Sequence, residues 1–329
     1  MNARILTAAT LFTVFAGALT AGAADSQLLS LVMPDAKVLA GVNVDQAKAS
    51  PFGLYVLSQM QTQEVQQLKA LTGFDPSQDV HELLFAAGAP TGQKQTGLVL
   101  ARGRFDVAKI AAVAVLKGAI TEGYGGVTIV EDPKRQVGVA FPDPTLAIAG
   151  DLANVKAAID RPHSGQSLPV SLTVMVDRWS LKEDVWVVSA VPPSSLQPPA
   201  AAGALPGGAQ NMQAMFAKIL SAAGGVKFGS AVVVTGQAEA DNAQDAASMG
   251  DTLKLLANLA LMQASQKDPQ AAALLQSLTV TTQGTLLNVS VTLPMDTLQQ
   301  MIKAKTAPAS GPATRIMPPK TPRVPAPKQ

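Results

Sequence analysis

Four side chains that could bind a metal lie within eight residues of one another, namely Asp75, Asp79, His81 and Glu82. Zinc and non-haem iron accept these ligand types, but their sites normally include two or more imidazoles or thiolates. The sequence holds one further histidine, His163, and no cysteine. We therefore expect Asp75 and Asp79 to make turn and helix-cap hydrogen bonds and no metal to be bound.

Calcium would need oxygen ligands, and Asp241, Asp245 and Asp251 place three carboxylates near the start of an expected helix. Their spacing differs from that of a twelve-residue calcium loop, which has alternate ligands, a central glycine and a terminal glutamate. Acidic residues at a helix start are also favoured by the helix dipole alone. We expect no calcium and no other cofactor.

Nucleophilic catalysis is not expected, because the sequence lacks a Gly-x-Ser-x-Gly elbow and has only two histidines. The glycines at 123, 125 and 126 precede an expected strand, so they do not form a dinucleotide loop. A hydrolase that uses two carboxylates stays an alternative, since any two acids can meet in a fold. No particular pair is singled out by the sequence.

The N-terminus has the features of a secretory signal peptide. Arg4 is followed by an uncharged, apolar run from Ile5 to about Gly22. Ala21 and Ala23 then form the small-x-small pattern at which signal peptidase cuts, so we expect cleavage before Ala24. An uncleaved membrane anchor is the alternative. Residues 1–23 are thus predicted to direct the chain to the periplasm or to secretion and to be removed.

The C-terminus is basic and rich in proline. Residues 24–296 carry 18 basic and 23 acidic side chains, and six basic residues follow Asp296: Lys303, Lys305, Arg315, Lys320, Arg323 and Lys328. We expect residues 306–329 to be disordered. Such a tail could contact anionic envelope polymers or lipid headgroups, or it could be solvated without a partner. Nucleic-acid binding is not expected, because the body is acidic and aromatic residues make up 4% of the chain.

The pattern along residues 24–305 predicts an α+β fold. Expected strands cover residues 37–44, 83–87, 98–101, 127–130, 137–141, 146–149, 184–188, 230–235, 278–282 and 287–293. Expected helices cover residues 50–72, 106–118, 151–159, 243–262 and 296–305. The pattern predicts that the order of elements in residues 24–165 recurs in residues 166–305, which contain a Pro- and Gly-rich loop at 192–210. We therefore expect two pseudo-repeated halves, each a mostly antiparallel sheet with helices packed on one face.

Several short motifs lie at the starts of these elements: Met33-Pro34-Asp35, Ser50-Pro51-Phe52-Gly53, Thr72-Gly73-Phe74-Asp75-Pro76 with Asp79-Val80, and Gly103-Arg104-Phe105-Asp106. In this layout the chain resembles uncharacterised exported bacterial proteins, the periplasmic domain-of-unknown-function families of the acidobacterial type. The resemblance spans most of residues 28–303. It implies a duplicated α+β fold and a periplasmic location, and it implies no active site.

The expected helix at 243–262 has a wide apolar face, which includes Met249, Leu253, Leu256, Leu259 and Met262. Such a face either packs on the sheet or forms an adaptable binding groove. Together these features predict an exported, non-catalytic binding or interaction protein of the bacterial envelope. A periplasmic carrier of an apolar ligand and the acid-pair hydrolase are the alternatives. The sequence predicts neither the partner nor the oligomeric state.

Overall fold

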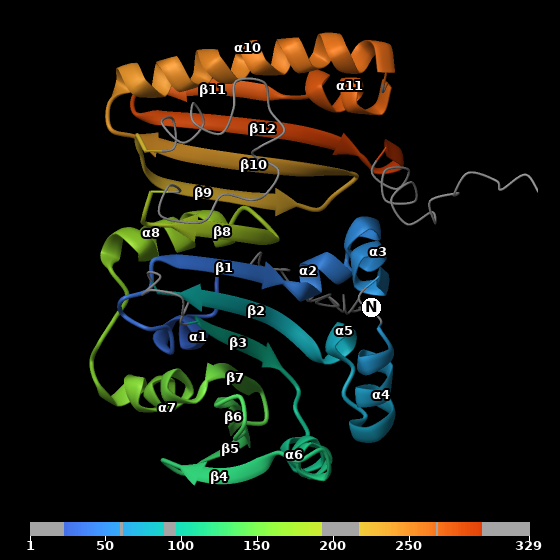
Figure 1. Cartoon of the computed structure of the whole chain (residues 1–329), viewed down its shortest axis with the longest axis vertical. Coiled ribbons are helices and arrows are strands. Elements are labelled where there is room, and N and C mark those ends of the chain that lie inside the picture. The colour runs from blue at the N-terminus through green and yellow to red at the C-terminus, as the bar shows by residue number, and fades with distance from the viewer. Residues whose placement is uncertain (1–22, 60–61, 89–96, 193–216, 268, 298–329) are drawn as a thin grey trace, which may run out of the picture.

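The fold is taken from a computed structural model, which describes residues 23–59, 62–88, 97–192, 217–267 and 269–297 (Figure 1). The helices are α1 Ser26–Ser30, α2 Val44–Lys48, α3 Pro51–Gln59, α4 Gln63–Thr72, α5 Pro76–Asp79, α6 Val107–Leu116, α7 Leu152–Asp160, the 3-10 helix η1 Arg161–His163, α8 Val170–Ser180, α10 Ala243–Lys267 and α11 Pro269–Gln276. The strands are β1 Val38–Asn43, β2 Val80–Ala87, β3 Gly97–Gly103, β4 Ile120–Tyr124, β5 Val127–Asp132, β6 Val137–Asp143, β7 Leu146–Asp151, β8 Val185–Ser189, β9 Ile219–Lys227, β10 Ala231–Ala240, β11 Thr279–Gln283 and β12 Leu286–Pro294.

Local signals set several helix ends as expected. The carboxylates of Asp106 and Asp151 cap α6 and α7 by accepting hydrogen bonds from backbone N–H groups three residues later. Gly73 ends α4 with a left-handed backbone, φ 77°, which glycine adopts without steric cost. The helix expected over residues 50–72 is in fact two helices, α3 and α4, with Thr62 capping the second.

The twelve strands of the described residues form one antiparallel sheet in the order β11-β12-β10-β9-β8-β1-β2-β3-β7-β6-β5-β4. The α+β class is therefore confirmed. The expectation of a separate sheet in each half is wrong, because β1 and β8 pair directly, with Gly41 opposite Trp186. This pairing joins two strand edges that would otherwise expose unpaired backbone groups. The pseudo-repeat is not confirmed.

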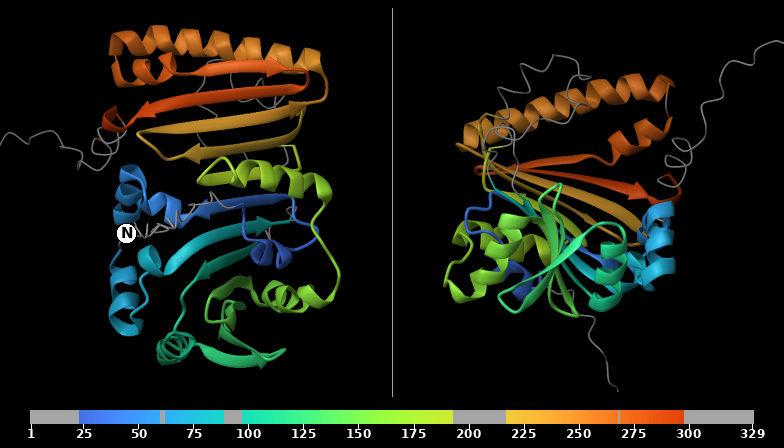
Figure 2. Two further views of the ribbon diagram at one scale, coloured as in Figure 1. Left: turned by 180° about the vertical axis from the view of Figure 1, so that it is seen from behind. Right: turned by 60° about the horizontal axis from the view of Figure 1, so that its bottom comes forward.

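Helices cover both faces of the sheet, so the expectation of helices on one face is also wrong (Figure 2). On one side, which we call the closed face, α1, α7 and α8 pack over the central strands. Their side chains form the largest core cluster with Leu39, Leu84, Leu100, Ile148 and Trp186. Leu28 of α1, Val155 of α7 and Val176 of α8 are fully buried in it. This cluster is the main core of the protein.

Among the described residues, the opposite side carries α6 and α10, each toward one end of the sheet. Near β7, β6 and β5, α6 packs in a cluster with Phe105, Phe141 and Val130. Toward the other end, α10 packs through Ala246 and Met249 against Leu287 of β12. Cross-strand partners project to the same face, and residues two apart on a strand do as well. By this alternation, both clusters lie on one side of the sheet, and the middle strands lie between them.

Candidate functional site

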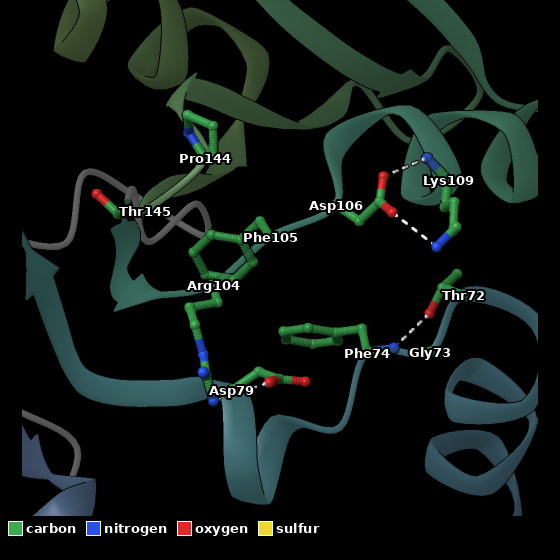
Figure 3. A pocket seen from close by; sticks show the side chains of 10 residues that line it. All are labelled: Thr72, Gly73, Phe74, Asp79, Arg104, Phe105, Asp106, Lys109, Pro144 and Thr145. Atoms are coloured by element: carbon green, nitrogen blue, oxygen red, sulfur yellow. Dashed lines mark hydrogen bonds and ion pairs between the residues drawn. The ribbon is translucent and has the colours of Figure 1, made fainter.

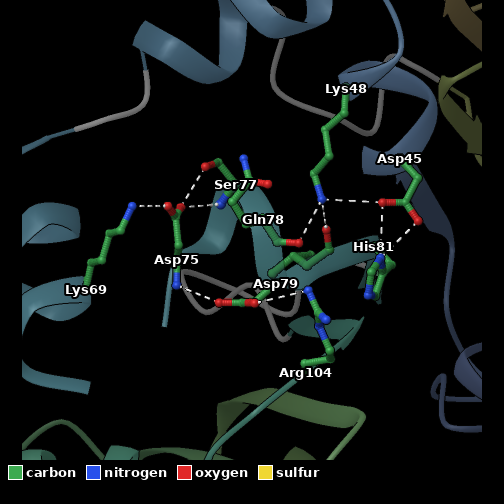
Figure 4. A network of polar contacts seen from close by, with 10 residues as sticks. Asp45, Lys48, Lys69, Asp75, Ser77, Gln78, Asp79, His81 and Arg104 are labelled. Atoms are coloured by element: carbon green, nitrogen blue, oxygen red, sulfur yellow. Dashed lines mark hydrogen bonds and ion pairs between the residues drawn. The ribbon is translucent and has the colours of Figure 1, made fainter. Parts of the chain in front are cut away.

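The structure does not bring Asp75, Asp79, His81 and Glu82 together at one site (Figure 4). Asp79 accepts a hydrogen bond from the backbone N–H of Asp75 at 2.8 Å and pairs with Arg104 at 3.5 Å. His81 contacts Asp45 instead, at 2.9 Å. Glu82, the next residue on β2, projects to the other face of the sheet. Among the residues that the structure describes, no three His, Asp or Glu side chains converge to hold a metal.

Asp75 has the capping role that the sequence predicts. Its Oδ1 accepts from the backbone N–H of Ser77 at 3.0 Å and from the Ser77 hydroxyl at 2.6 Å, at the start of α5. Its Oδ2 accepts from Lys69 Nζ at 2.7 Å. The hydrogen bond from Lys69, followed by that from Ser77, lowers the pKa of Asp75 to about 2. Asp75 therefore stays ionised and fixes the segment between α4 and β2.

A cleft of about 550 Å³ opens beside this segment, between the end of α4 and the start of α6 (Figure 3). The Phe74 and Phe105 rings, whose centroids are 5.5 Å apart, line it. Its two cations are Arg104, paired with Asp79, and Lys109, whose Nζ lies 2.9 Å from Asp106. Neither cation was predicted as a site residue, although the three-residue spacing of Asp106 and Lys109 is typical of an ion pair on a helix.

Both carboxylates of the cleft are already engaged by cations. The hydrogen bonds from the Lys109 side chain and backbone keep the pKa of Asp106 below its usual range. An acid-pair hydrolase needs one carboxyl that is protonated near neutral pH, and Asp106 is ionised there. Asp106 therefore does not supply the protonated carboxyl of such a pair.

A larger apolar surface lies in the middle of the sheet, on the side that carries α6 and α10. One row across the strands runs Gly236, Gly224, Val187, Ala40, Phe85 and Val99, and the neighbouring row runs Val234, Val226, Val185, Val42 and Leu83. We call these eleven residues the open face. None of them is charged or polar. An apolar surface that crosses six adjacent strands is a candidate binding surface.

Side chains of the open face are accessible to solvent. Phe85, Val187 and Val234 are 40%, 43% and 38% exposed, although each belongs to a strand inside the sheet. A Cβ added to Gly236 would meet no atom within 4 Å. On the same strands, the side chains of the closed face are buried, with Trp186 4% and Leu84 0% exposed. The two faces of the central strands thus differ sharply in what covers them.

The apolar face predicted for residues 243–262 is divided along α10. Met249 is buried and Leu253 is partly buried against the sheet. Farther along, Leu255, Leu259 and Met262 are 60%, 42% and 68% exposed. The first half of the helix therefore packs on the sheet as expected. The second half keeps Leu256 and Leu261 half-buried and also contacts α11, and its residues Leu255, Leu259 and Met262 form an apolar stripe exposed to solvent.

The other predicted residues are placed as follows. Ala23 is exposed and Ala24 is half-buried at the start of the described chain. Ala21 lies outside the described residues, as do nearly all of the loop at 192–210 and the whole tail with Lys303, Lys305, Arg315, Lys320, Arg323 and Lys328. The signal peptide and the tail contacts therefore stay predictions. Within the described residues, no helix is long and apolar enough to cross a bilayer.

Comparison with known proteins adds evidence on the fold. Neither a protein-family model nor a curated protein matches the sequence. The fold is similar to that of TP0453. Crystal form I of that protein superposes with a TM-score of 0.51 at 11% identity, over 86% of this chain and 99% of TP0453. Crystal form III gives 0.50 at 11% identity, over 84% and 97%. At this identity the likeness shows the fold alone.

Proposed function

We propose that this chain is an exported binding protein that acts without catalysis, and that the open face is its binding surface. The observation that carries the proposal is the half-exposed apolar middle of the sheet, where Phe85 and Val187 project from the same row across the strands, on either side of Ala40. Large apolar side chains exposed together on sheet-interior strands mark interaction sites in soluble proteins. Export is supported by the signal-peptide features of residues 1–23.

The partner that fits this surface is an amphipathic helix of another exported protein. The same side of the sheet already binds helices at both ends, where α10 packs on Leu287 and α6 packs on Ala147. Strands β10, β9, β8, β1, β2 and β3 lie between β12 and β7, which carry those two contact sites. Six strands span about 29 Å, which accommodates a helix about 10 Å wide. The open face therefore resembles the covered parts of its own side in both chemistry and size.

The test places a photo-crosslinking benzoylphenylalanine at position 187 in cells that export the protein. Position 137 serves as the matched control, because Val137 is also a strand valine, 41% exposed, and lies on β6 away from the open face. We expect a protein adduct, identified by mass spectrometry, at position 187 and not at position 137. A lipid adduct at 187 would instead support the apolar-ligand carrier. No adduct, or equal adducts at both positions, would overturn the proposal.

Val187→Glu then gives the quantitative prediction. In the free protein the new carboxylate reaches water, because Val187 is 43% exposed, so the fold should be retained. In the complex it would be buried without a partner, and we expect the affinity for the purified crosslinked partner to fall at least roughly tenfold. Val137→Glu should leave that affinity unchanged. Calorimetric titration with the purified partner measures the affinity of both variants. Equal affinities for Val187→Glu and the parent would exclude the open face as the binding surface.

A further inference from the structure

The expected cleavage site lies directly beside the core of the closed face. Helix α1 begins at Ser26, two residues after Ala24, and Leu28 is fully buried. The buried Arg161 donates a hydrogen bond from Nη1 to the backbone carbonyl of Leu31. The residues immediately after the expected cut are therefore fixed in the fold, and a new N-terminus at Ala24 would have a defined environment.

Four side chains surround that position, and with Ala24 they form what we call the N-terminal corner: Asp25, Glu82, Arg102 and Ser180. The backbone N–H of Ala24 donates to Ser180 Oγ at 3.0 Å, and Ser180 is 8% exposed at the end of α8. The backbone N–H of Asp25 donates to Glu82 Oε1 at 3.1 Å. Arg102 Nε donates to the Asp25 carboxylate at 2.8 Å.

The charges of the N-terminal corner do not balance in the uncleaved chain. Asp25 and Glu82 contribute two carboxylates, from the start of α1 and from β2. Arg102 on β3 contributes the one guanidinium among these contacts, and α8 contributes the neutral Ser180 hydroxyl. Burial, together with the charge of Asp25, raises the pKa of Glu82. The corner therefore has one carboxylate more than it has cations, and the ionised form of Glu82 is destabilised there.

We propose that cleavage between Ala23 and Ala24 completes this corner, because the freed α-ammonium of Ala24 becomes a structural cation bound by Ser180 and Glu82. The inference rests on the proposed export. Hydrolysis of the peptide bond consumes one water, leaves a carboxylate on the leader and leaves an amine on Ala24 that takes up a proton. The nitrogens of Ala24 and Asp25 are roughly 3–4 Å apart through their shared bonds. Because the Asp25 nitrogen is 3.1 Å from Glu82 Oε1, the ammonium would lie at most about 7 Å from that oxygen.

The direction of the pH effect follows from the sign of the charge. An α-amino group in an unfolded chain has a pKa of about 8, and a neighbouring carboxylate raises that pKa in the folded chain. A raised folded pKa means that the stabilisation is fully present below about pH 8 and is lost as the pH rises through the folded value. The processed chain should therefore lose this advantage in alkaline solution.

The experiment compares a chain that starts at Ala24 with a free amine and the same chain preceded by Gly-Ser, each with and without Glu82→Gln. The Gly-Ser extension keeps the Ala24 N–H as an amide and moves the terminal ammonium two residues away from the N-terminal corner. We expect the extended chain to melt about 2–4 °C lower at pH 7. The difference should shrink above about pH 9. In the Glu82→Gln background the extension should have little effect. Equal melting temperatures, or an equal loss in both backgrounds, would overturn the inference.

N-terminal sequencing of the protein recovered from exporting cells separates this inference from the export proposal. A chain that begins at Ala24 supports both. An exported chain cut elsewhere would overturn the role of the Ala24 ammonium and leave export standing. An intact Met1 on protein from the cytosol would overturn both.

Discussion

Replacing Trp186 by alanine is expected to lower the free energy of unfolding by about 3–5 kcal/mol, the usual loss when a buried tryptophan leaves a cavity. Trp186 is 4% exposed on β8. Its ring lies directly over Gly41 of β1, where any Cβ would collide with it. These two strands join the N-terminal and C-terminal parts of the sheet. The cavity would therefore open at the junction of the two parts.

Urea unfolding followed by circular dichroism measures this loss. Val187→Ala is the matched control, because Val187 is the next residue of β8 but projects to the open face and is 43% exposed. We expect that control to lose less than about 1 kcal/mol. A loss below about 1 kcal/mol for Trp186→Ala would show that the junction of β1 and β8 does not depend on this contact.

The second large effect is expected at Asp75, where alanine should lower the free energy of unfolding by about 2–3 kcal/mol. The substitution removes a helix cap, which contributes about 1 kcal/mol, and an ion pair with Lys69. The Asp75 side chain is 9% exposed, but Lys69 is 51% exposed, so solvent weakens the pair. Asp75→Asn keeps a capping oxygen and removes the charge, so it should lose only about 1 kcal/mol.

The contribution of the Asp75 charge has a defined pH dependence. Its folded pKa of about 2 lies below its ordinary value of 3.8. A depressed pKa stabilises the fold above about pH 4, and this stabilisation is lost as the pH falls toward about 2. The stability difference between the parent and Asp75→Asn should therefore be constant from about pH 5 to 7 and shrink below about pH 4. Acid titrations of both proteins measure it, and a difference that grows in acid would contradict the assignment.

Much of the secondary structure could be predicted from local signals. Gly73 ends a helix and Asp106 and Asp151 start helices, because each effect acts within four residues. Helix α8 was missed because it begins after Pro169 without a side-chain cap. Strand β9 was missed because its two central glycines and its alanines have low strand propensity. The single sheet was not predictable, since β1 and β8 are paired by contacts between distant parts of the sequence.

The candidate site was predictable only in part. The role of Asp75 followed from its place in a Thr-Gly-Phe-Asp-Pro turn. The open face could not be predicted from the sequence, because Phe85 and Val187 belong to apolar runs that are typical of strands buried on both faces. Their exposure results from where α6 and α10 pack, which is decided by other segments. A sequence pattern shows that a strand is apolar, and only the fold shows which of its faces is covered.

The most direct test of the binding proposal uses the absence of cysteine from the chain, which makes one introduced thiol a unique reporter. Val187→Cys should react readily with a maleimide in the purified protein and become protected in intact envelopes, where the partner is present. Val137→Cys, at a position of nearly the same exposure, should react in both samples. A position 187 thiol that is already protected in the purified protein, or that reacts equally in both samples, would contradict the open face as the binding surface.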